Sequence, residues 1–342
     1  MKKIILIAYA LTCTASLYAG HSKELKLTSP EGVHEVMFRQ EKISSSVNEI
    51  VYQVKYRGRE VIGSSRAGLQ LDNRTWELAL ARKINQVKCW MDNWEVDSVI
   101  YQPAVNKSWH PLYGERSTVR EAYNEATMYL SKKDGSNYRL NIEVRAYDEG
   151  IAFRYFFPEH PQAIFHKVVG DLTEYTFSPG AMAWAEQWAQ APFEHLAIND
   201  IKQPVERALT VELSNGLWVA LTDADVDDWC LTKLVASPTK QNTLTSVMYS
   251  PVDIVTYYAT PWKVIMAADK PGELLEHNDI IQNLNPPCEI TDTDWIRPGK
   301  IMRETTITTE GAIATIDFCA AHHIPYMSVS YTHLTLPTKL EV

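Results

Sequence analysis

The sequence contains none of the residue clusters that mark nucleic-acid or phosphate binding. It has no run of lysine and arginine, and its formal net charge is −9. A phosphate backbone is bound through clustered cations, so a nucleic-acid partner is not expected. The glycines of SPGAMAW and ADKPGELL lack the spacing of a phosphate-binding loop, and both segments are predicted to be turns.

Cysteine is scarce and has no metal-binding spacing. The chain has five cysteines, and beyond the first twenty residues they form no CxxC motif and no Cys/His pair of the kind that zinc requires. Their spacing does not decide whether they form disulfides, and buried free thiols are the favoured interpretation. These four cysteines are Cys89, Cys230, Cys288 and Cys319.

An apolar run long enough to span a bilayer is also missing. Residues 1–20, MKKIILIAYALTCTASLYAG, combine two lysines, a short apolar core and small residues near Ala19 and Gly20. The core is too short, and too interrupted by Thr and Ser, for a membrane span. This layout predicts a signal peptide over residues 1–20, and hence an exported protein with no transmembrane span in its mature chain. The segment ALTC before Cys13 is a poor lipoprotein signal.

The sequence does contain a long series of strand patterns. From Leu25 to about Ala268, segments such as NEIVYQVKYRG and YRLNIEVRAYDEGIAFRYFF alternate apolar and polar residues, and turn signals such as KKDGSN separate them. The hydrophobic fraction of 45% and ten tryptophans can fill a large core, although exported proteins also use tryptophan to stack on sugars. We predict two packed antiparallel sheets over residues 21–285.

The pattern changes at the double proline Pro286-Pro287. The acidic, Thr-rich residues behind it predict a linker over 286–298. GKIMRETTI then predicts a strand, TTEGAIATIDFCAAHH a helix with its N-cap at Thr308 or Thr309, and IPYM a second strand. Strand, helix, strand is the opening unit of a parallel α/β domain. The apolar stripe of the expected helix consists of Ile313, Ile316, Phe318 and Ala320.

Residues 260–327, together with SPEGVHEVMFR, EGIAFRYFFPEH and LTVELSNGLWVAL, resemble glycoside hydrolase family 97. This family comprises exported α-glucosidases and α-galactosidases of polysaccharide-utilisation systems. The resemblance runs from Leu27 to Met327 and implies a periplasmic enzyme acting on oligosaccharides. It also implies a mainly β fold: an N-terminal β-super-sandwich, of galactose-mutarotase-like shape, followed by a catalytic (β/α)8 barrel and a small C-terminal β-domain.

The family pattern ends at Met327, where SVSYTHLTLPTKLEV replaces it. A complete barrel takes about 250 residues, and residues 299–327 hold only its first strand, helix and strand. We therefore expect a truncated chain in which 328–342 are a foreign, disordered read-through tail. Glycoside hydrolysis needs two carboxyl groups beside the scissile bond. With most barrel strands absent, we assign no catalytic residue and expect no activity; the sugar, the stereochemistry and the oligomeric state stay open.

Family members hold a calcium ion with active-site glutamates, one of which comes from the N-terminal domain. In AWAEQWAQAPFEHLAIND, the segment FEHL matches the family best and assigns this role to Glu194, with Glu186 as the rival. Because calcium takes six to eight oxygen ligands, Glu194 alone should bind it weakly or not at all. The structural alternative is that both glutamates are solvated loop residues.

The aromatic residues of this segment are candidates for sugar binding. Trp184, Trp188 and Phe193 could stack on a sugar beside Glu194, or they could pack against the face of the barrel. His195 is a weaker candidate, because a loop histidine is more often a surface hydrogen-bonding group.

Other functions find less support in the sequence. A non-catalytic carbohydrate-binding sandwich is the alternative to the enzyme. Epimerase chemistry needs a paired acid and base in one cleft; His160, His166 and Glu174 supply the residue types but no motif. TDADVDDWC lacks the glycine and the glutamate of a calcium-binding EF-hand loop, and it is predicted to be a strand end and a turn.

Overall fold

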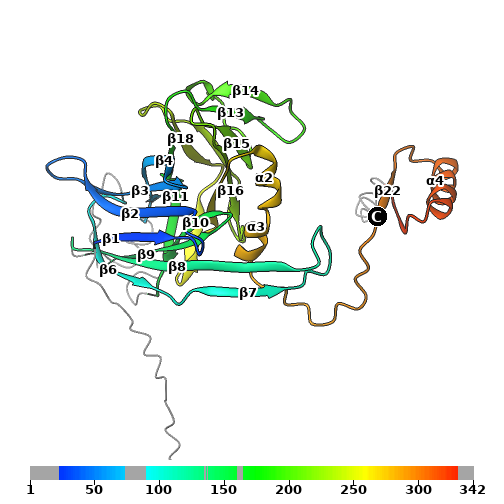
Figure 1. Ribbon diagram of the computed structural model, residues 1–342, viewed down its shortest axis with the longest axis horizontal. Coiled ribbons are helices and arrows are strands. Elements are labelled where there is room, and N and C mark those ends of the chain that lie inside the picture. Colours follow the sequence, from blue (N-terminus) through cyan, green and yellow to red (C-terminus); the bar gives the residue numbers. More distant parts are fainter. Residues whose placement is uncertain (1–22, 74–89, 135, 137, 160–164, 330–342) are drawn as a thin grey trace, which may run out of the picture. The chain divides into compact units, whose positions relative to one another are not determined.

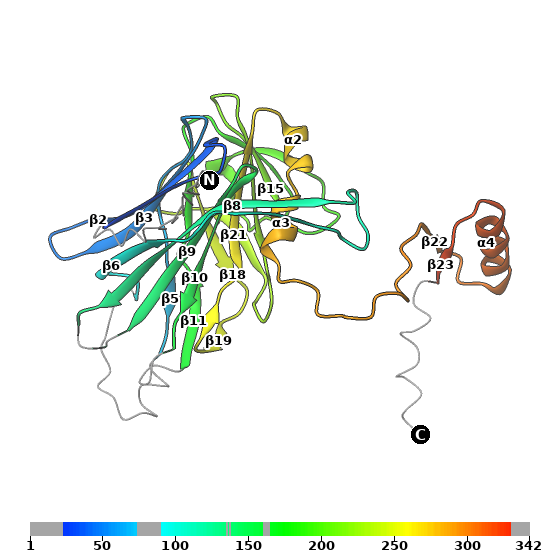
Figure 2. The ribbon, with the colours of Figure 1, turned by 60° about the horizontal axis from the view of Figure 1, so that its bottom comes forward.

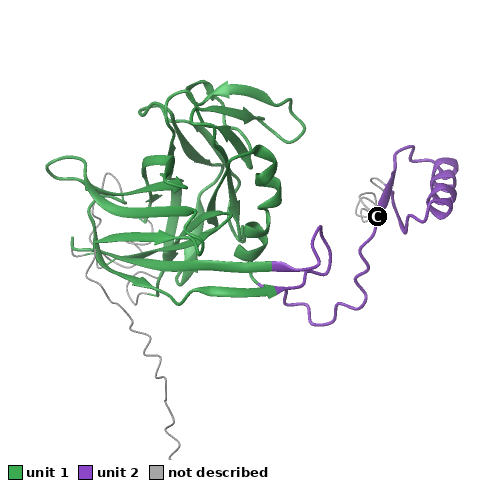
Figure 3. Cartoon of the chain, viewed as in Figure 1, with its two compact units in different colours: residues 1–108, 120–286 green, residues 109–119, 287–342 purple. Residues whose placement is uncertain are grey.

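A computed structural model describes residues 23–73, 90–134, 136, 138–159 and 165–329. The predicted signal peptide, Cys89, His160 and residues 330–342 lie outside this part of the chain. The chain divides into two compact units (Figure 3). One comprises the residues up to 108 together with 120–286, and the other comprises 109–119 together with 287–342. The division at Pro286 and Pro287 coincides with the start of the expected linker.

The larger unit is built from antiparallel sheets (Figures 1 and 2). The first has the order β1-β2-β3-β4, formed by β1 (Glu24–Thr28), β2 (His34–Lys42), β3 (Asn48–Tyr56) and β4 (Arg59–Arg66). A large sheet has the order β14-β13-β15-β16-β21-β10-β9-β8-β6, with β20 beside β10 and β7 beside β8. Its strands are β6 (Trp94–Tyr101), β7 (Val105–Trp109), β8 (Val119–Lys132), β9 (Arg139–Tyr147), β10 (Gly150–Phe157), β13 (Met182–Ala185), β14 (Glu194–Ala197), β15 (Leu209–Glu212), β16 (Trp218–Ala224), β20 (Tyr258–Ala259) and β21 (Trp262–Ala268).

Two small sheets complete the described part of this unit. One has the order β19-β11-β5, from β5 (Leu69–Leu71), β11 (Phe165–Asp171) and β19 (Val252–Val255). The other has the order β12-β18-β17, from β12 (Glu174–Thr176), β17 (Thr232–Ala236) and β18 (Thr243–Met248). The prediction of only two sheets was therefore too simple, because such short strands carry too few residues for a clear alternating pattern.

The first sheet packs face to face on the large sheet. Strand β2 contacts β9 and β10, and the rings of Phe38, Tyr52 and Phe153 meet at the centre of the interface. The Phe38 and Phe153 centroids are 5.2 Å apart, and those of Tyr52 and Phe153 are 4.9 Å apart. All three side chains are fully buried. The predicted mainly β fold with sheets packed face to face is thus confirmed.

Three short helical segments were not predicted. They are a 3-10 helix over Ile198–Asp200, α2 (Pro271–Glu276) and α3 (Asp279–Leu284). Helices α2 and α3 contact β16, and α2 also contacts β21. The prediction of a turn for ADKPGELL was wrong, since Pro271 begins α2 and Leu274 is buried. Helices of six residues are too short to show a helical period in the sequence. In the described residues, no helix is long and apolar enough to cross a membrane.

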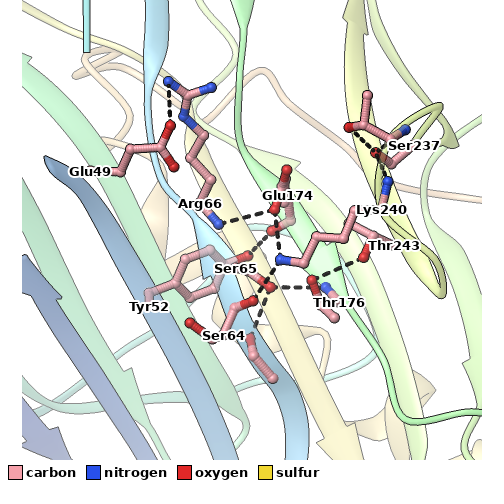
Figure 4. A network of polar contacts seen from close by, with 12 residues as sticks. Glu49, Tyr52, Ser64, Ser65, Arg66, Glu174, Thr176, Ser237, Lys240 and Thr243 are labelled. Atoms are coloured by element: carbon pink, nitrogen blue, oxygen red, sulfur yellow. Dashed lines mark hydrogen bonds and ion pairs between the residues drawn. The ribbon is translucent and has the colours of Figure 1, made fainter. Parts of the chain in front are cut away.

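Glu174 joins the first sheet to the small sheet of β12 (Figure 4). The Tyr52 hydroxyl donates to the Glu174 carbonyl at 2.6 Å. The Lys240 ammonium donates to the Glu174 carboxylate at 2.9 Å and to the Ser64 carbonyl at 2.7 Å. The backbone N–H of Arg66 donates to the same carboxylate at 3.3 Å. Strands β3 and β4 are thereby fixed to β12 through charge-assisted bonds.

A buried ion pair joins the large sheet to the sheet of β11. The Lys263 ammonium on β21 lies 2.5 Å from a carboxylate oxygen of Asp171, and the two side chains are only 7% and 1% exposed. The other Asp171 oxygen accepts the backbone N–H of Thr173 at 3.0 Å. Burial removes both charges from water, so each depends on the other for compensation.

The smaller unit contains the predicted strand, helix and strand. Parallel strands β22 (Ile301–Glu304) and β23 (Tyr326–Val329) pair with each other, and α4 (Thr309–Ala321) lies between them in the chain. The Thr308 hydroxyl accepts the N–H of Gly311 at 3.0 Å, which confirms Thr308 as the N-cap. Strand β23 extends two residues beyond the expected boundary at Met327. The side chains of Ile313 and Ile316 on α4 are exposed.

Removing one partner of the buried ion pair should be costly. We expect Asp171→Ala to lower the free energy of unfolding by about 3 to 5 kcal/mol, because Lys263 would remain buried without compensation. Lys133→Met is the control: it removes an exposed pair with Asp97, at 3.2 Å, and should cost about 1 kcal/mol or less. Urea unfolding measures both. A similar small loss in the two variants would contradict this role for Asp171.

His34 should make the fold sensitive to acid. Burial lowers the pKa of His34 to about 3; His277 and Arg57 also lower it, whereas the Asp148 backbone raises it. The unfolded chain has a histidine pKa of about 6.5 and binds more protons between these values, so stability falls as pH falls from 6.5 towards 3. At pH 4 the loss is about 3 kcal/mol. His34→Phe should not show this loss of unfolding free energy when urea unfolding is compared at pH 4 and pH 7. If the wild type and the variant lose equal stability, the protons are taken up by groups other than His34.

Candidate functional site

The predicted site residues all lie on one hairpin at the end of the large sheet. Strands β13 and β14 form this hairpin, visible at the top of Figure 1, and residues 186–193 connect them. The register pairs Trp184 with His195 and Ala185 with Glu194. Strand β13 also pairs with β15, which fixes the hairpin to the rest of the sheet.

Three large aromatic side chains of the hairpin face solvent. Trp184 is 41% exposed, Trp188 58% and Phe193 62%. Single exposed apolar residues are common, but three on one hairpin form a surface suited to binding.

His195 stacks on Trp184. The two ring centroids are 4.3 Å apart and the planes are nearly parallel, at 16°. Nε2 of His195 lies 3.7 Å from a carboxylate oxygen of Glu212 on β15. The imidazole therefore covers one face of the indole and is itself held by the neighbouring strand. Glu212 could not be predicted from the sequence, because its place beside His195 depends on the register of β13 and β15.

The strand register separates two residues that the sequence had grouped together. Directly opposed residues of an antiparallel pair share a face, and successive residues alternate between faces. Trp184 and His195 thus lie on one face of the hairpin, whereas Glu194 lies on the other face, with Ala185. The structure therefore brings Trp184 together with His195 and Glu212, and not with Glu194.

Glu194 is exposed at the start of β14, and Glu186 is half-buried at the end of β13. Among the described residues, no group of three or more His, Cys, Asp or Glu side chains is placed to hold a metal ion. Glu194 can offer one carboxylate, which does not by itself form a calcium site of six to eight oxygens.

The acidic segment after β16 forms a strand end and a turn, as predicted. Strand β16 ends at Ala224, and Asp225 and Asp228 adopt positive φ angles of 55° and 48°. Asp223 forms a buried ion pair with Arg207, and Asp225 pairs with Arg154 at 3.2 Å. These carboxylates serve the fold through arginine contacts.

The acid and base types considered for epimerase chemistry have separate structural roles. His166 is buried, its Nδ1 lies 2.9 Å from the side-chain nitrogen of Asn73, and its ring lies 5.1 Å from that of Phe157. Glu174 belongs to the network around Lys240. The described residues thus give these two side chains different partners.

The described cysteines are free thiols. Cys319 is buried, as expected. Cys230 is half-buried and Cys288 is exposed, so the expectation of burial was wrong for these two. Cys288 follows directly on the double proline, outside the packed sheets.

Comparison with known proteins identifies the family of the larger unit. Residues 27–287 match the family model described as Glycosyl-hydrolase 97 N-terminal. A retaining alpha-galactosidase of Bacteroides thetaiotaomicron is 24% identical, over 96% of this chain and 52% of that protein. A probable retaining alpha-galactosidase of Streptomyces bingchenggensis is 22% identical, over 75% of this chain and 38% of that protein. The chain thus spans about half or less of these relatives.

Solved structures share the fold. A glycoside hydrolase family 97 enzyme from Pseudoalteromonas sp. strain K8, in complex with panose, superimposes with a TM-score of 0.76 at 21% identity. The match covers 89% of this chain and 47% of that one. A beta-arabinopyranosidase structure matches with a TM-score of 0.71 at 16% identity, over 89% of this chain and 50% of that one. With the family model matched over residues 27–287, the chain belongs to glycoside hydrolase family 97, of which it carries the N-terminal domain.

Proposed function

We propose that this chain supplies the N-terminal domain of an exported α-glycoside hydrolase that acts on oligosaccharides and depends on calcium in its complete form. The observation that carries this proposal is the family match over residues 27–287. Two relatives bear the names retaining alpha-galactosidase and probable retaining alpha-galactosidase, and structures of a family member are described in complex with panose and with acarbose. The proposed substrates are therefore oligosaccharides with α-galactosyl or α-glucosyl residues.

The hairpin of β13 and β14 is the part of this domain that would meet the substrate. Indole and phenyl rings stack on the apolar C–H faces of sugars, and Trp184, Trp188 and Phe193 expose such rings. The imidazole of His195 stacks on one face of the Trp184 ring and restricts its orientation. A ring held in place loses less conformational entropy when a ligand binds.

Glu194 would contribute to calcium binding from the opposite face of the hairpin. Its exposed carboxylate leaves the start of β14, where a second domain could approach it. Since one carboxylate satisfies only a small part of a calcium shell, the remaining ligands would come from outside the described residues. We expect the chain as given to bind calcium weakly.

The smaller unit would be the beginning of the catalytic barrel. Its two parallel strands and the helix between them have the order of one barrel repeat. Parallel strands are normally covered on both faces and flanked by further strands. The exposed Ile313 and Ile316 of α4 are consistent with a unit that is completed by more protein.

Sugar binding by the hairpin can be measured directly. Panose should bind weakly, with Kd on the order of millimolar, because two or three exposed rings offer little burial. Saturation-transfer NMR should detect this binding, and Trp188→Ala should reduce the signal several-fold. Tyr113→Ala, which removes another exposed ring, is the matched control and should leave it unchanged. An unchanged signal in Trp188→Ala would contradict the proposed role of the hairpin.

The 342-residue chain should not hydrolyse aryl α-galactosides or α-glucosides. Hydrolysis needs an acid and a base or nucleophile on either side of the scissile bond, and we place this pair on the barrel. The assay is release of the aryl group by purified protein. Turnover that persists through purification and disappears in Glu194→Gln would show that the catalytic groups lie within this chain. Sugar binding without turnover, in a longer chain that includes a barrel, would favour the carbohydrate-binding alternative.

A further inference from the structure

Lys233 makes three contacts beside the loop of residues 186–193. This residue lies on β17, and its side chain is only 8% exposed. Its ammonium donates a hydrogen bond to the backbone carbonyl of Gln187 at 2.6 Å. It also forms an ion pair with Glu206 at 2.6 Å and lies 5.6 Å from the centre of the Tyr249 ring.

Glu206 also forms a backbone hydrogen bond with the same loop. Its backbone N–H donates to the carbonyl of Glu186 at 2.8 Å. The first two residues of the loop are thus bonded to Glu206 and to Lys233, which are bonded to each other. Further along the loop the chain turns, since the N–H of Ala191 donates to the carbonyl of Trp188 and Gln190 has a φ of 76°.

Lys233 lies on a strand that is hydrogen-bonded on both sides. Strand β17 pairs with β18 in a register that sets Lys233 opposite Val247. The neighbouring Leu234 exchanges two backbone hydrogen bonds with Val205, which directly precedes Glu206. The ammonium is therefore held by a strand, and not by a second mobile loop.

Lys233 stays charged because of its partners. The hydrogen bond that the Lys233 ammonium donates to the Glu206 carboxylate is the main cause that raises the pKa of Lys233, while burial acts in the opposite direction. A cation placed on a carbonyl and a carboxylate gives charge-assisted bonds, which are stronger than neutral ones. Such bonds can stabilise a loop that buries little apolar surface because its aromatic side chains are exposed.

The ring of Tyr249 is exposed and lies at the ammonium of Lys233. Tyr249 follows β18, its backbone N–H donates to the carbonyl of Leu231 at 3.0 Å, and its side chain is 56% exposed. Trp188 directly follows Gln187, whose carbonyl the ammonium binds. Lys233 thus connects the backbone that carries Trp188 to the ring of Tyr249.

We propose that Lys233 is a positioning residue for the sugar-binding loop and that Tyr249 is a further stacking face for a pyranose ring of the same oligosaccharide. This inference rests on the proposed role of the hairpin in sugar binding. Neither residue belongs to the segment 184–195 that the sequence pointed to. Lys233 reaches the loop from β17, and Tyr249, which follows β18, contacts the Lys233 ammonium.

Chymotrypsin tests the positioning role without any ligand. It can cleave after Trp188, and in Lys233→Met this cleavage should become about tenfold faster, because the loop opens more often when its tie is lost. Lys233→Arg keeps the cation and should restore slow cleavage. Lys133→Met, which removes an exposed ion pair with Asp97, is the control.

The pattern of cleavage separates positioning from general destabilisation. Global unfolding would speed cleavage at sites throughout the chain and lower the melting temperature, whereas loss of positioning affects the bond after Trp188 first. Glu206→Gln weakens the same tie without burying a new apolar group, and it serves if Lys233→Met does not fold. Unchanged cleavage after Trp188 in both variants would overturn the role of Lys233.

Saturation-transfer NMR with panose tests Tyr249. The signal should fall several-fold in Tyr249→Ala and in Lys233→Met, and stay unchanged in Tyr113→Ala. If the wild-type chain binds panose and both variants bind it equally well, the inference is overturned. If the wild-type chain binds no panose, the sugar role of the hairpin and of Tyr249 fails, while cleavage after Trp188 still decides the role of Lys233.

Discussion

The ion pair between Lys263 and Asp171 is the contact on which the arrangement of the sheets depends most. It connects the middle of the large sheet to the last residue of β11, in an environment almost without solvent. Two residues later, Thr173 donates its N–H to the same carboxylate, and β12 begins at Glu174. The buried pair therefore sets the position from which Glu174 reaches Tyr52, Arg66 and Lys240.

Charged residues at the sheet junctions serve specificity as well as stability. A buried ion pair often gains little over apolar residues of equal volume, but an incorrect pairing leaves a charge uncompensated. Lys263 with Asp171 joins the large sheet to the sheet of β11, and Lys233 with Glu206 joins β17 to the segment before β15. Each pair penalises a slipped register or a displaced strand.

The candidate site lies where the large sheet ends. Among the described strands, β14 is at the edge of the large sheet, and the loop that precedes it lies at the surface, where its side chains can meet another molecule. The loop therefore buries little surface of its own. The stack of His195 on Trp184 and the hydrogen bond from Lys233 to the Gln187 carbonyl stabilise it instead. The proposed sugar-binding role rests on these exposed rings and on the bonds that hold their backbone.

The sequence by itself determined the local features. Alternation predicted the strands, the double proline marked the change of pattern, and Thr308 was predicted as the N-cap of α4, because each depends on neighbouring residues. It also singled out the segment with Trp184 and Glu194, which was expected to be a loop and forms the hairpin of β13 and β14. Helices α2 and α3 were missed, since six residues are too few to show a period.

Only the tertiary structure decided the partners. Lys240 meets Glu174 across 66 residues of sequence, and Lys233 meets the carbonyl of Gln187 across 46. The register of β13 with β14 decided that Trp184 faces His195 and that Glu194 lies on the other side. Strand order and register result from the packing of the whole domain, and a shift of one residue would exchange the two faces while leaving the local pattern unchanged.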